Sequence, residues 1–188
     1  MVFGQNHCDL EAQSACLHPF LRNSVGSMEF GGVFLNKRLN RANGAPGPGG
    51  RVFGTQRRTT DAAELAIAVL YQNPIQNFAI TPNNLTDAPT AALDFLREVP
   101  TTWDETRLID GYPGRNIVLA RRKGATWYVA ALNADEQPYT LDIKAIEARL
   151  GGSARTLCTG ADGLQVLSAA PKKPLRLQKD DGAVLIVR

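Results

Sequence analysis

The chain of 188 residues contains only two histidines and three cysteines. An odd number of cysteines without a familiar spacing cannot build a disulfide framework. A metal site made from His7, Cys8, Cys16 and His18 can be drawn, but usual zinc sites place ligand pairs two to four residues apart on tight turns. We therefore predict no metal site here and interpret the cysteines as partly buried thiols.

The sequence also lacks a long apolar run and a strong charge of either sign. No run approaches the roughly 20 residues that span a bilayer. The net charge of +3 is too small to indicate a nucleic-acid partner, which needs a clustered basic face. Residues 1–10 include Asn6, His7 and Asp9, so they do not resemble a signal peptide. We predict neither a nucleic-acid nor a membrane partner, and these residues alone leave the location unknown.

What the sequence does contain is enough apolar material for a packed core, with 44% hydrophobic and 21% charged residues. Its pattern changes near Pro100. Before that residue, Ala62–Gln72 predicts a helix, with Asp61 as N-cap and Glu64 completing a capping box. Apolar residues lie on nearly every face of this helix, so other structure must cover it.

The other segments before Pro100 predict short elements of both kinds. Residues 9–23 predict a helix that Pro19 breaks in two, and Asp87–Val99 predicts a second helix. Met28–Leu35 predicts a short buried strand, and residues 41–57 form a glycine-rich loop. This mixture is typical of an α/β arrangement.

After Pro100 the pattern becomes strand-like, with short runs bounded by Gly, Pro or Asp. The first two runs are joined by Lys123-Gly124-Ala125, which predicts a hairpin. Such spacing is typical of a small antiparallel β-sandwich. The predicted strands are 116–122, 126–133, 139–143, 155–159, 164–167, 175–177 and 183–187.

Several stretches, in the right order along the chain, resemble glycoside hydrolase family 97. They are His18–Phe30, Arg58–Ala66, Gln72–Ala79 and, most closely, Val99–Gly114 with its Pro-Thr-Thr-Trp-Asp-Glu-Thr-Arg. This sequence departs from the family at three positions: Leu21 replaces threonine, Ser27 replaces proline and Glu29 replaces aspartate. These departures leave the subfamily and its substrate open.

The resemblance implies an α+β chain with two parts. Residues 1–98 would be the last units of a (β/α)₈ barrel, containing its seventh helix, eighth strand (Met28–Leu35) and eighth helix. Residues 99–188 would be the C-terminal β-sandwich, a domain of oligomerisation type. A whole barrel takes about 250 residues, so this one would be incomplete.

The same resemblance implies the C-terminal part of a calcium-using enzyme that hydrolyses α-glucosides or α-galactosides. Its substrate would be an oligosaccharide or glycoside, its state a homo-oligomer, and its location periplasmic or secreted. The catalytic carboxylates and calcium-binding glutamates of the family lie upstream of the matched segments. We therefore predict no catalytic residue in this chain and no activity alone. The alternative is a non-catalytic β-sandwich module for oligomerisation or carbohydrate binding.

Five carboxylates have candidate roles. Glu29 is the candidate substrate-binding residue, placed near the carboxyl end of the eighth strand, where barrel active sites lie; the alternative is a buried structural hydrogen bond. Asp9 and Glu11 would flank a catalytic loop or, more simply, cap and solvate a helix start. Asp104 and Glu105 are adjacent and would point to opposite faces of a strand, so we interpret them as turn or junction residues.

Aromatic side chains offer a second route to sugar binding. Trp103, Tyr112, Trp127 and Tyr128 could stack on a pyranose, although core packing is the commoner use and is predicted for Trp127. The basic run 121–123 is interpreted as a solvated hairpin tip.

Overall fold

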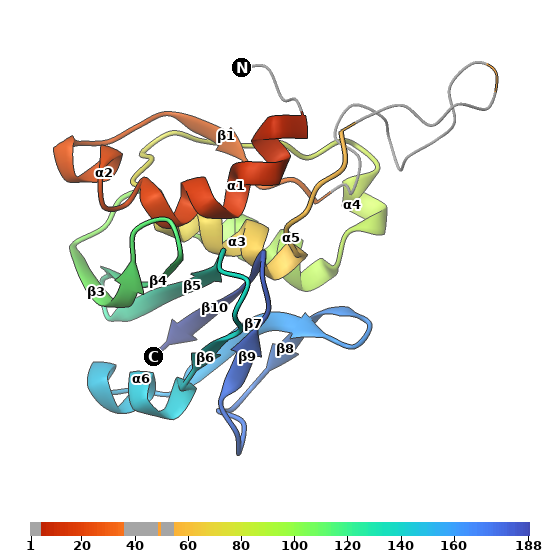
Figure 1. Ribbon diagram of the computed structural model, residues 1–188. Coiled ribbons are helices and arrows are strands. Elements are labelled where there is room, and N and C mark those ends of the chain that lie inside the picture. The colour runs from red at the N-terminus through yellow and green to blue at the C-terminus, as the bar shows by residue number, and fades with distance from the viewer. Residues whose placement is uncertain (1–4, 36–48, 50–54) are drawn as a thin grey trace.

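The computed structural model describes residues 5–35, 49 and 55–188. Helices predominate up to residue 98 and strands follow, as the change of pattern near Pro100 predicted (Figure 1). The first part contains α1 (Gln5–Leu17), α2 (Arg22–Val25), β1 (Phe30–Gly32), α3 (Asp61–Leu70), β2 (Gln76–Phe78), α4 (Asn84–Asp87) and α5 (Thr90–Glu98).

The second part is built on one antiparallel sheet of six strands in the order β3-β4-β5-β10-β7-β8. The predicted hairpin at Gly124 joins β4 to β5. A separate antiparallel pair, β6-β9, and one helix complete it. The bounds are β3 (Glu105–Tyr112), β4 (Asn116–Lys123), β5 (Thr126–Asn133), β6 (Tyr139–Leu141), α6 (Ile143–Leu150), β7 (Ala154–Gly160), β8 (Gly163–Leu167), β9 (Leu175–Leu177) and β10 (Asp181–Val187).

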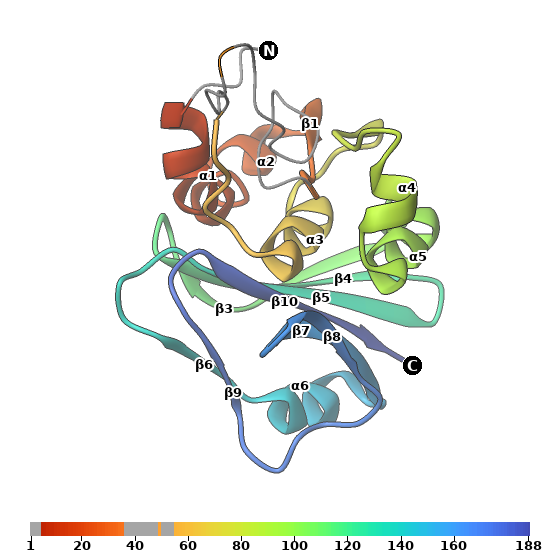
Figure 2. The same ribbon diagram turned by 90° about the vertical axis from the view of Figure 1, so that its right-hand side faces the viewer.

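Both faces of the six-stranded sheet are covered (Figure 2). Helices α1, α3 and α5 pack on one face, and β6, β9 and α6 lie on the other. The central strands β5 and β10 are therefore apolar almost without alternation, because neither face meets water. The predicted second sheet of the sandwich consists of only two strands, and α6 covers the rest of that face.

Helix α3 lies at the centre of the molecule. Every residue from Ala62 to Leu70 is buried, which confirms that a helix apolar on all sides must be covered. The expected capping was wrong. Thr60, not Asp61, is the N-cap, and its hydroxyl accepts the backbone N–H of Ala63 at 3.1 Å.

Gly182 on β10 lets α3 approach the sheet closely. A Cβ at this position would lie 2.8 Å from the Cα of Ala63 and 2.8 Å from the carbonyl oxygen of Ala131. Both neighbours are backbone atoms that cannot rotate away. The contact between α3 and the sheet therefore requires glycine at residue 182.

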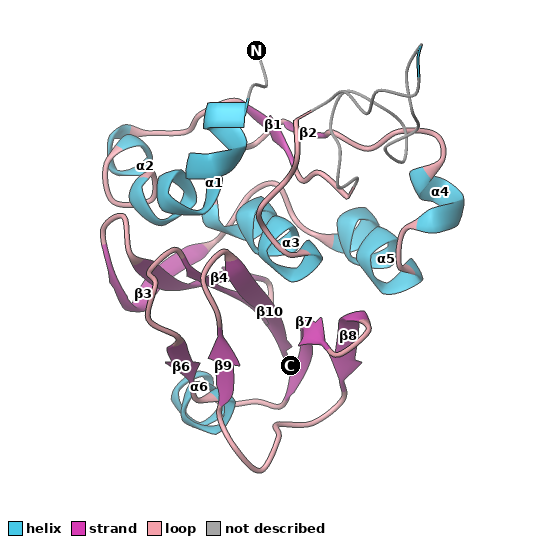
Figure 3. Cartoon of the chain, turned by 45° about the vertical axis from the view of Figure 1, so that its right-hand side comes forward, coloured by secondary structure: helices cyan, strands magenta, loops and turns pink. Residues whose placement is uncertain are grey.

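Strands β1 and β2 form a small parallel pair on the far side of the helix layer from the six-stranded sheet (Figure 3). They are joined through α3, which makes a β-α-β unit. The helices thus lie between two sheets, and the core on this side includes residues from both parts of the chain.

The remaining predictions before Pro100 hold with shifted ends. Helix α1 ends at Leu17, directly before the His18–Pro19 dipeptide, and the chain resumes a short helix at Arg22. The residue before a proline avoids the helical region, which explains the break. Helix α5 begins after Pro89, three residues later than Asp87.

Four elements were missed, namely β2, α4, β3 and α6. Strand β3 begins at Glu105, inside the stretch interpreted as a turn or junction. Helix α6 follows a predicted strand that ends at Leu141 rather than 143. Its signals were present, because Asp142 caps its start by accepting from Ala145 N–H and Gly151 ends it in the left-handed conformation.

The glycine-rich loop at 41–57 lies outside the described residues except for residue 49 and residues 55–57. Within the described part of the chain, no helix has the length and apolar character needed to cross a membrane.

Candidate functional site at the carboxyl end of β1

The carboxyl end of β1 lies beside that of β2. The strands pair in parallel from Phe30–Gln76 to Gly32–Phe78, and Ala79 N–H then donates to the Gly32 carbonyl at 2.7 Å. In parallel α/β structures this end of the strands is where ligands bind. It is therefore the place in this part of the chain where functional groups are expected.

Val33, the residue directly after β1, has a strained backbone. Its φ of 63° lies in the left-handed region, which a β-branched side chain rarely adopts. The side chain is 2% exposed and belongs to the core between the helices and β1. Such an outlier persists only where surrounding structure imposes it, and outliers of this kind cluster at functional sites.

Both backbone groups of the next residue, Phe34, are held by buried charged side chains. Phe34 N–H donates to Glu64 Oε2 at 2.7 Å, and the Phe34 carbonyl accepts from Arg57 Nη1. Glu64 is fully buried in the first turn of α3, and Arg57 is 8% exposed. We call Glu64 and Arg57 the Phe34 clamp.

The clamp is braced by two neighbours. Thr59 donates its hydroxyl proton to Glu64 Oε1, and Arg57 Nη2 donates to Asp61 Oδ1 at 2.5 Å. Arg57 and Asp61 form a partly buried ion pair four residues apart. The clamp is therefore fixed to the first turn of α3 at several points.

A second buried carboxyl, Glu11 from α1, lies beside Glu64. It is 2% exposed, and burial, followed by the charge of Glu64, raises its pKa to about 9. Burial also raises the pKa of Glu64, but Arg57 and the donors from Thr59 and Phe34 oppose the shift. We therefore place the proton that this pair retains at neutral pH on Glu11.

This arrangement cannot hydrolyse a glycoside by itself. Hydrolysis needs two carboxyl groups on either side of the scissile bond, with room for the sugar between them. Glu11 and Glu64 are both closed off from solvent and lie side by side. What they can do is fix the backbone around them.

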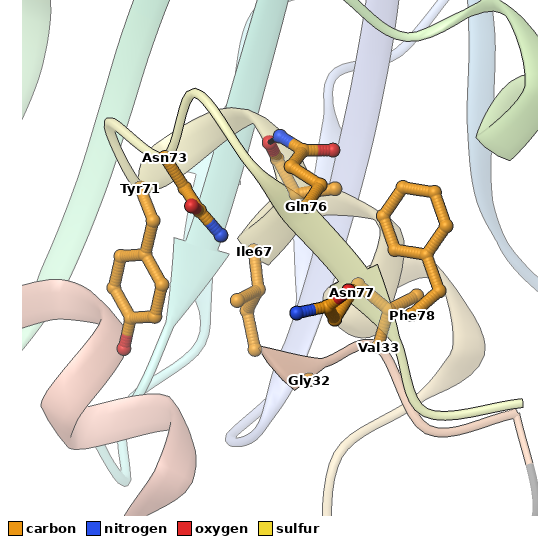
Figure 4. A pocket seen from close by; sticks show the side chains of 9 residues that line it. Gly32, Val33, Ile67, Tyr71, Asn73, Gln76, Asn77 and Phe78 are labelled. Carbon is orange, nitrogen blue, oxygen red and sulfur yellow. Dashed lines mark hydrogen bonds between the residues drawn. The ribbon is translucent and has the colours of Figure 1, made fainter. Parts of the chain in front are cut away.

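A small cavity lies nearby, between β1, β2 and α3 (Figure 4). Its volume of about 10 Å³ suits a single water molecule and excludes a sugar. Gln76 donates from Nε2 to the Ala68 carbonyl at 2.8 Å, and its Oε1 is buried without a partner. One water would satisfy that oxygen. The cavity lining comprises Gly32, Val33, Ile67, Ala68, Tyr71, Asn73, Gln76, Asn77 and Phe78.

Residues 102–158 match the family model described as glycosyl-hydrolase 97 C-terminal, oligomerisation. This stretch is similar to the C-terminal domain of glycoside hydrolase family 97.

Two curated relatives are described as α-galactosidases. A probable retaining α-galactosidase of Streptomyces bingchenggensis is 41% identical over 119 residues, which is 63% of this chain and 16% of that protein. A retaining α-galactosidase of Bacteroides thetaiotaomicron is 40% identical over 73 residues, 39% of this chain and 11% of that protein. The chain thus spans about a sixth or less of the length of these relatives.

Solved structures match nearly the whole length of this chain. A β-arabinopyranosidase is 48% identical with a TM-score of 0.81, over 99% of this chain and 29% of that one. A family 97 enzyme from Pseudoalteromonas sp. strain K8, solved with acarbose, has a TM-score of 0.68 at 24% identity, over 98% of this chain and 30% of that one. The latter likeness concerns the fold alone.

The carboxylates that the sequence singled out are not brought together. Glu29 is exposed and directly precedes β1, so it lies at the amino end of that strand and not near the carboxyl end. Nothing in the structure tests its contact with substrate, which stays a prediction. Asp9 pairs with Arg58 at 2.9 Å on the surface, as a solvated helix residue should.

Three other assignments are corrected. Glu11 is buried, because its position in α1 faces α3 rather than solvent. Glu105 opens β3 and accepts from Arg107 and Arg122, whereas Asp104 accepts the N–H of Gly124. Arg121 is 3% exposed and not part of a solvated tip, because its side chain points from β4 toward the helix layer.

The aromatic residues divide between core and surface. Trp127 is buried, as predicted, beneath the guanidinium of Arg107 at 4.6 Å. Tyr128 is also buried and meets Trp103 edge to face at 5.5 Å. Tyr112 alone among the four is exposed, by 64%, and remains able to meet a partner.

The thiols are single and buried, and none forms a disulfide. Burial raises the pKa of the Cys8 thiol to about 11 and that of Cys16 to about 12. Both therefore stay protonated at neutral pH. Among residues 5–35, 49 and 55–188, no three His, Cys, Asp or Glu side chains converge as metal ligands.

Sequence reasoning missed the Phe34 clamp. The place of Glu64 three residues after Asp61 predicts only a role in helix capping. A carboxylate within an otherwise apolar helix was the available clue, because a buried charge needs a specific partner.

Proposed function

We propose that this chain is the carboxyl-terminal part of a family 97 glycosidase, in which residues 5–98 complete a (β/α)₈ barrel and residues 99–188 mediate self-association. The observation that carries the proposal is the 48% identity over 99% of the chain with a β-arabinopyranosidase more than three times as long. Such a match supports the same arrangement of barrel and C-terminal domain in this protein as in that longer enzyme.

The apolar side chains that the helical part exposes support the barrel assignment. A parallel pair such as β1-β2 normally lies within a larger sheet covered on both faces. Large apolar side chains are exposed around it on α1, α2, α4 and the turn before β2. They are Leu10, Leu21, Val25, Ile75 and Leu85, with 52, 57, 86, 70 and 62% exposure. Upstream barrel units would cover this surface.

The relatives favour one class of substrate. α-Galactosidases act on α-D-galactopyranosides, and β-L-arabinopyranose has the same configuration from C1 to C4 but lacks the hydroxymethyl group at C5. We propose a substrate of galacto configuration rather than an α-glucoside. A pocket that hydrogen-bonds an axial hydroxyl discriminates strongly against a sugar without it.

Catalysis in this proposal belongs to residues outside the chain. Neither of the buried glutamates can reach a substrate, and Glu29 is at most a contact residue. The family's use of calcium does not fit the described residues, since no three ligands converge and Arg57 lies beside the buried glutamates. We therefore assign no calcium-dependent step to this chain.

The experiment is to express this chain alone and as part of the longer polypeptide that the proposal predicts. The longer protein should hydrolyse nitrophenyl α-D-galactopyranoside or β-L-arabinopyranoside and leave the α-D-glucopyranoside nearly untouched. The 188-residue chain should be inactive on all three with or without calcium. Turnover by the short chain that is lost in Glu29→Gln would overturn the assignment of catalysis.

A further inference from the structure

The strained residue Val33 and the Phe34 clamp are adjacent, and no assigned function explains them. A left-handed β-branched residue is strained, and this conformation persists only where the surrounding structure over-determines it. Burying the charged groups Glu64 and Arg57 is also unfavourable unless they are well bonded. The strained backbone of Val33 and the buried charges of Glu64 and Arg57 occur at the same point of the chain. We take this coincidence to indicate a common purpose.

The hydrogen bonds show what that purpose is. Glu64 fixes the Phe34 N–H and Arg57 fixes the Phe34 carbonyl, so the peptide planes on both sides of Phe34 have set orientations. The plane before Phe34 is the one that defines ψ of Val33. The amino side of Val33 is fixed by the ladder, through Gly32 and its bond to Ala79. Val33 is thus the joint between a fixed strand and a fixed peptide.

The two side chains of this joint are also immobilised. Val33 and Phe34 are 2% and 4% exposed, and Val33 packs in the core that includes Ile67 and Leu70 of α3. The clamp residues come from the start of α3 and the segment before it. Helix α3 therefore determines the direction in which the chain leaves β1.

We propose that Glu64 and Arg57 are positioning residues that hold Val33 in its left-handed conformation and so aim the chain after β1 at the active-site face of the barrel. This inference rests on the proposed function for the barrel face, but the coupling between clamp and strain can be tested without it. Glu64 and Arg57 touch no substrate in this account. They act through the backbone of Phe34.

The first test is a double-mutant cycle on the 188-residue chain, measured by denaturant unfolding. Glu64→Leu removes the clamp and Val33→Gly removes the strain, since glycine adopts positive φ freely. Glu64→Leu lowers the folded-to-unfolded ratio by some factor in each background. We expect that factor to be at least ten times smaller in the Val33→Gly background than in the native one. Val118→Gly, a buried valine on the opposite face of the sheet, is the matched control and should combine additively.

Hydrogen exchange provides a readout that does not depend on the double variant folding. The Phe34 amide should exchange at least tenfold faster in Glu64→Leu and be restored toward the native rate in Glu64→Gln, whose amide oxygen can still accept. If the effects of Glu64→Leu and Val33→Gly on the free energy of unfolding are additive, or if the Phe34 exchange rate is unchanged in Glu64→Leu, the proposed role of the clamp is wrong.

The second test uses the longer polypeptide and its glycosidase activity. Glu64→Leu should lower kcat/KM at least tenfold at temperatures where the protein stays folded, with substantial recovery in Glu64→Gln. Glu147→Gln, a carboxylate of α6 that bonds Ala154 N–H on the far side of the sheet, should leave the kinetics unchanged. Native kinetics in Glu64→Leu would overturn the positioning role. A longer protein without any glycosidase activity would instead contradict the proposed function. The double-mutant cycle would still test whether Glu64 holds Val33 in its strained conformation.

Discussion

The guanidinium of Arg121 on β4 donates a 2.9 Å hydrogen bond from Nη2 to the main-chain carbonyl of Leu70, the last residue of α3. The carbonyls at the end of a helix have no partner within it. Here the sheet supplies one across the boundary predicted near residue 99. The two parts of the chain are therefore joined by a buried polar contact in addition to the shared apolar core.

Arg121→Met should destabilise the chain by about 2 kcal/mol, because the Leu70 carbonyl loses its partner in a buried place. Burial lowers the pKa of Arg121 to about 10, so the side chain is still charged at neutral pH and the bond is charge-assisted. Arg176→Met, on the exposed side of β9, is the matched control and should cost less than about 0.5 kcal/mol. Chemical denaturation at pH 7 measures both. Equal effects would mean that the contact contributes nothing specific.

Gly182→Ala should destabilise the chain by about 1–3 kcal/mol through overpacking, since the added Cβ meets backbone atoms of α3 and β5 at 2.8 Å. Gly26→Ala, where nothing lies within 4 Å of the new Cβ, should be close to neutral. The comparison by thermal unfolding isolates the close approach of α3 to the sheet. A neutral Gly182→Ala would show that α3 can move outward freely.

Glu11→Gln should make stability less dependent on pH. With a pKa raised to about 9, Glu11 keeps its proton when folded but releases it when unfolded above about pH 4.3. The native state then binds more protons than the unfolded state, so stability falls as pH rises between those values. Between pH 6.5 and 8 this single group removes up to about 2 kcal/mol.

The variant cannot ionise, so its free energy of unfolding should decline less over that interval. His7, 3.9 Å from Glu11, has its pKa lowered by burial, so its titration in the folded state moves away from this interval toward lower pH. Glu29→Gln, at an exposed position, is the control and should follow the native pH profile. Parallel profiles for all three proteins would contradict a protonated Glu11.

Self-association is predicted to use the free edge of β3. This edge strand exposes Leu108 by 47% and Tyr112 by 64%, and it lies within the residues that match the oligomerisation model. Edge strands with exposed apolar side chains are ready to pair with another chain. Leu108→Lys should therefore shift the protein toward monomer in light scattering.

Val166→Lys is the control for that experiment, because it alters the other edge strand, β8, outside the matched residues. Its 39% exposure is comparable with that of Leu108. An oligomer that dissociates with Val166→Lys and persists with Leu108→Lys would place the interface at the wrong edge. A native protein that is already monomeric would contradict the prediction altogether.

Deleting residues 1–98 should leave a product that aggregates or fails to fold. The helix layer covers one face of the six-stranded sheet, and that face carries Ile117, Leu119, Leu132, Leu157 and Ile186 in one core with α3. Removing the helices would expose all of them to water. Circular dichroism and light scattering of residues 99–188 would reveal the outcome, and a folded monomer would show that the sheet is independent of the helices.

Local pattern by itself determined most of the elements. The hairpin at Gly124, the break at Pro19, and α3 with its full cover all follow from backbone preferences and apolar spacing, which act within a few residues. The family resemblance likewise rests on contiguous stretches, and the match over residues 102–158 agrees with it. Such features need no knowledge of what lies across the fold.

Only the tertiary structure decided the roles of the charged residues. Glu11, Glu64 and Arg121 resemble ordinary surface or capping residues in sequence, yet all three are buried because the chain places another element over them. Glu64 faces Phe34, which is 30 residues away, and Arg121 faces Leu70, which is 51 away. A long-range partner determines whether a charge is solvated, bonded or protonated, and one stretch of sequence contains only half of each pair.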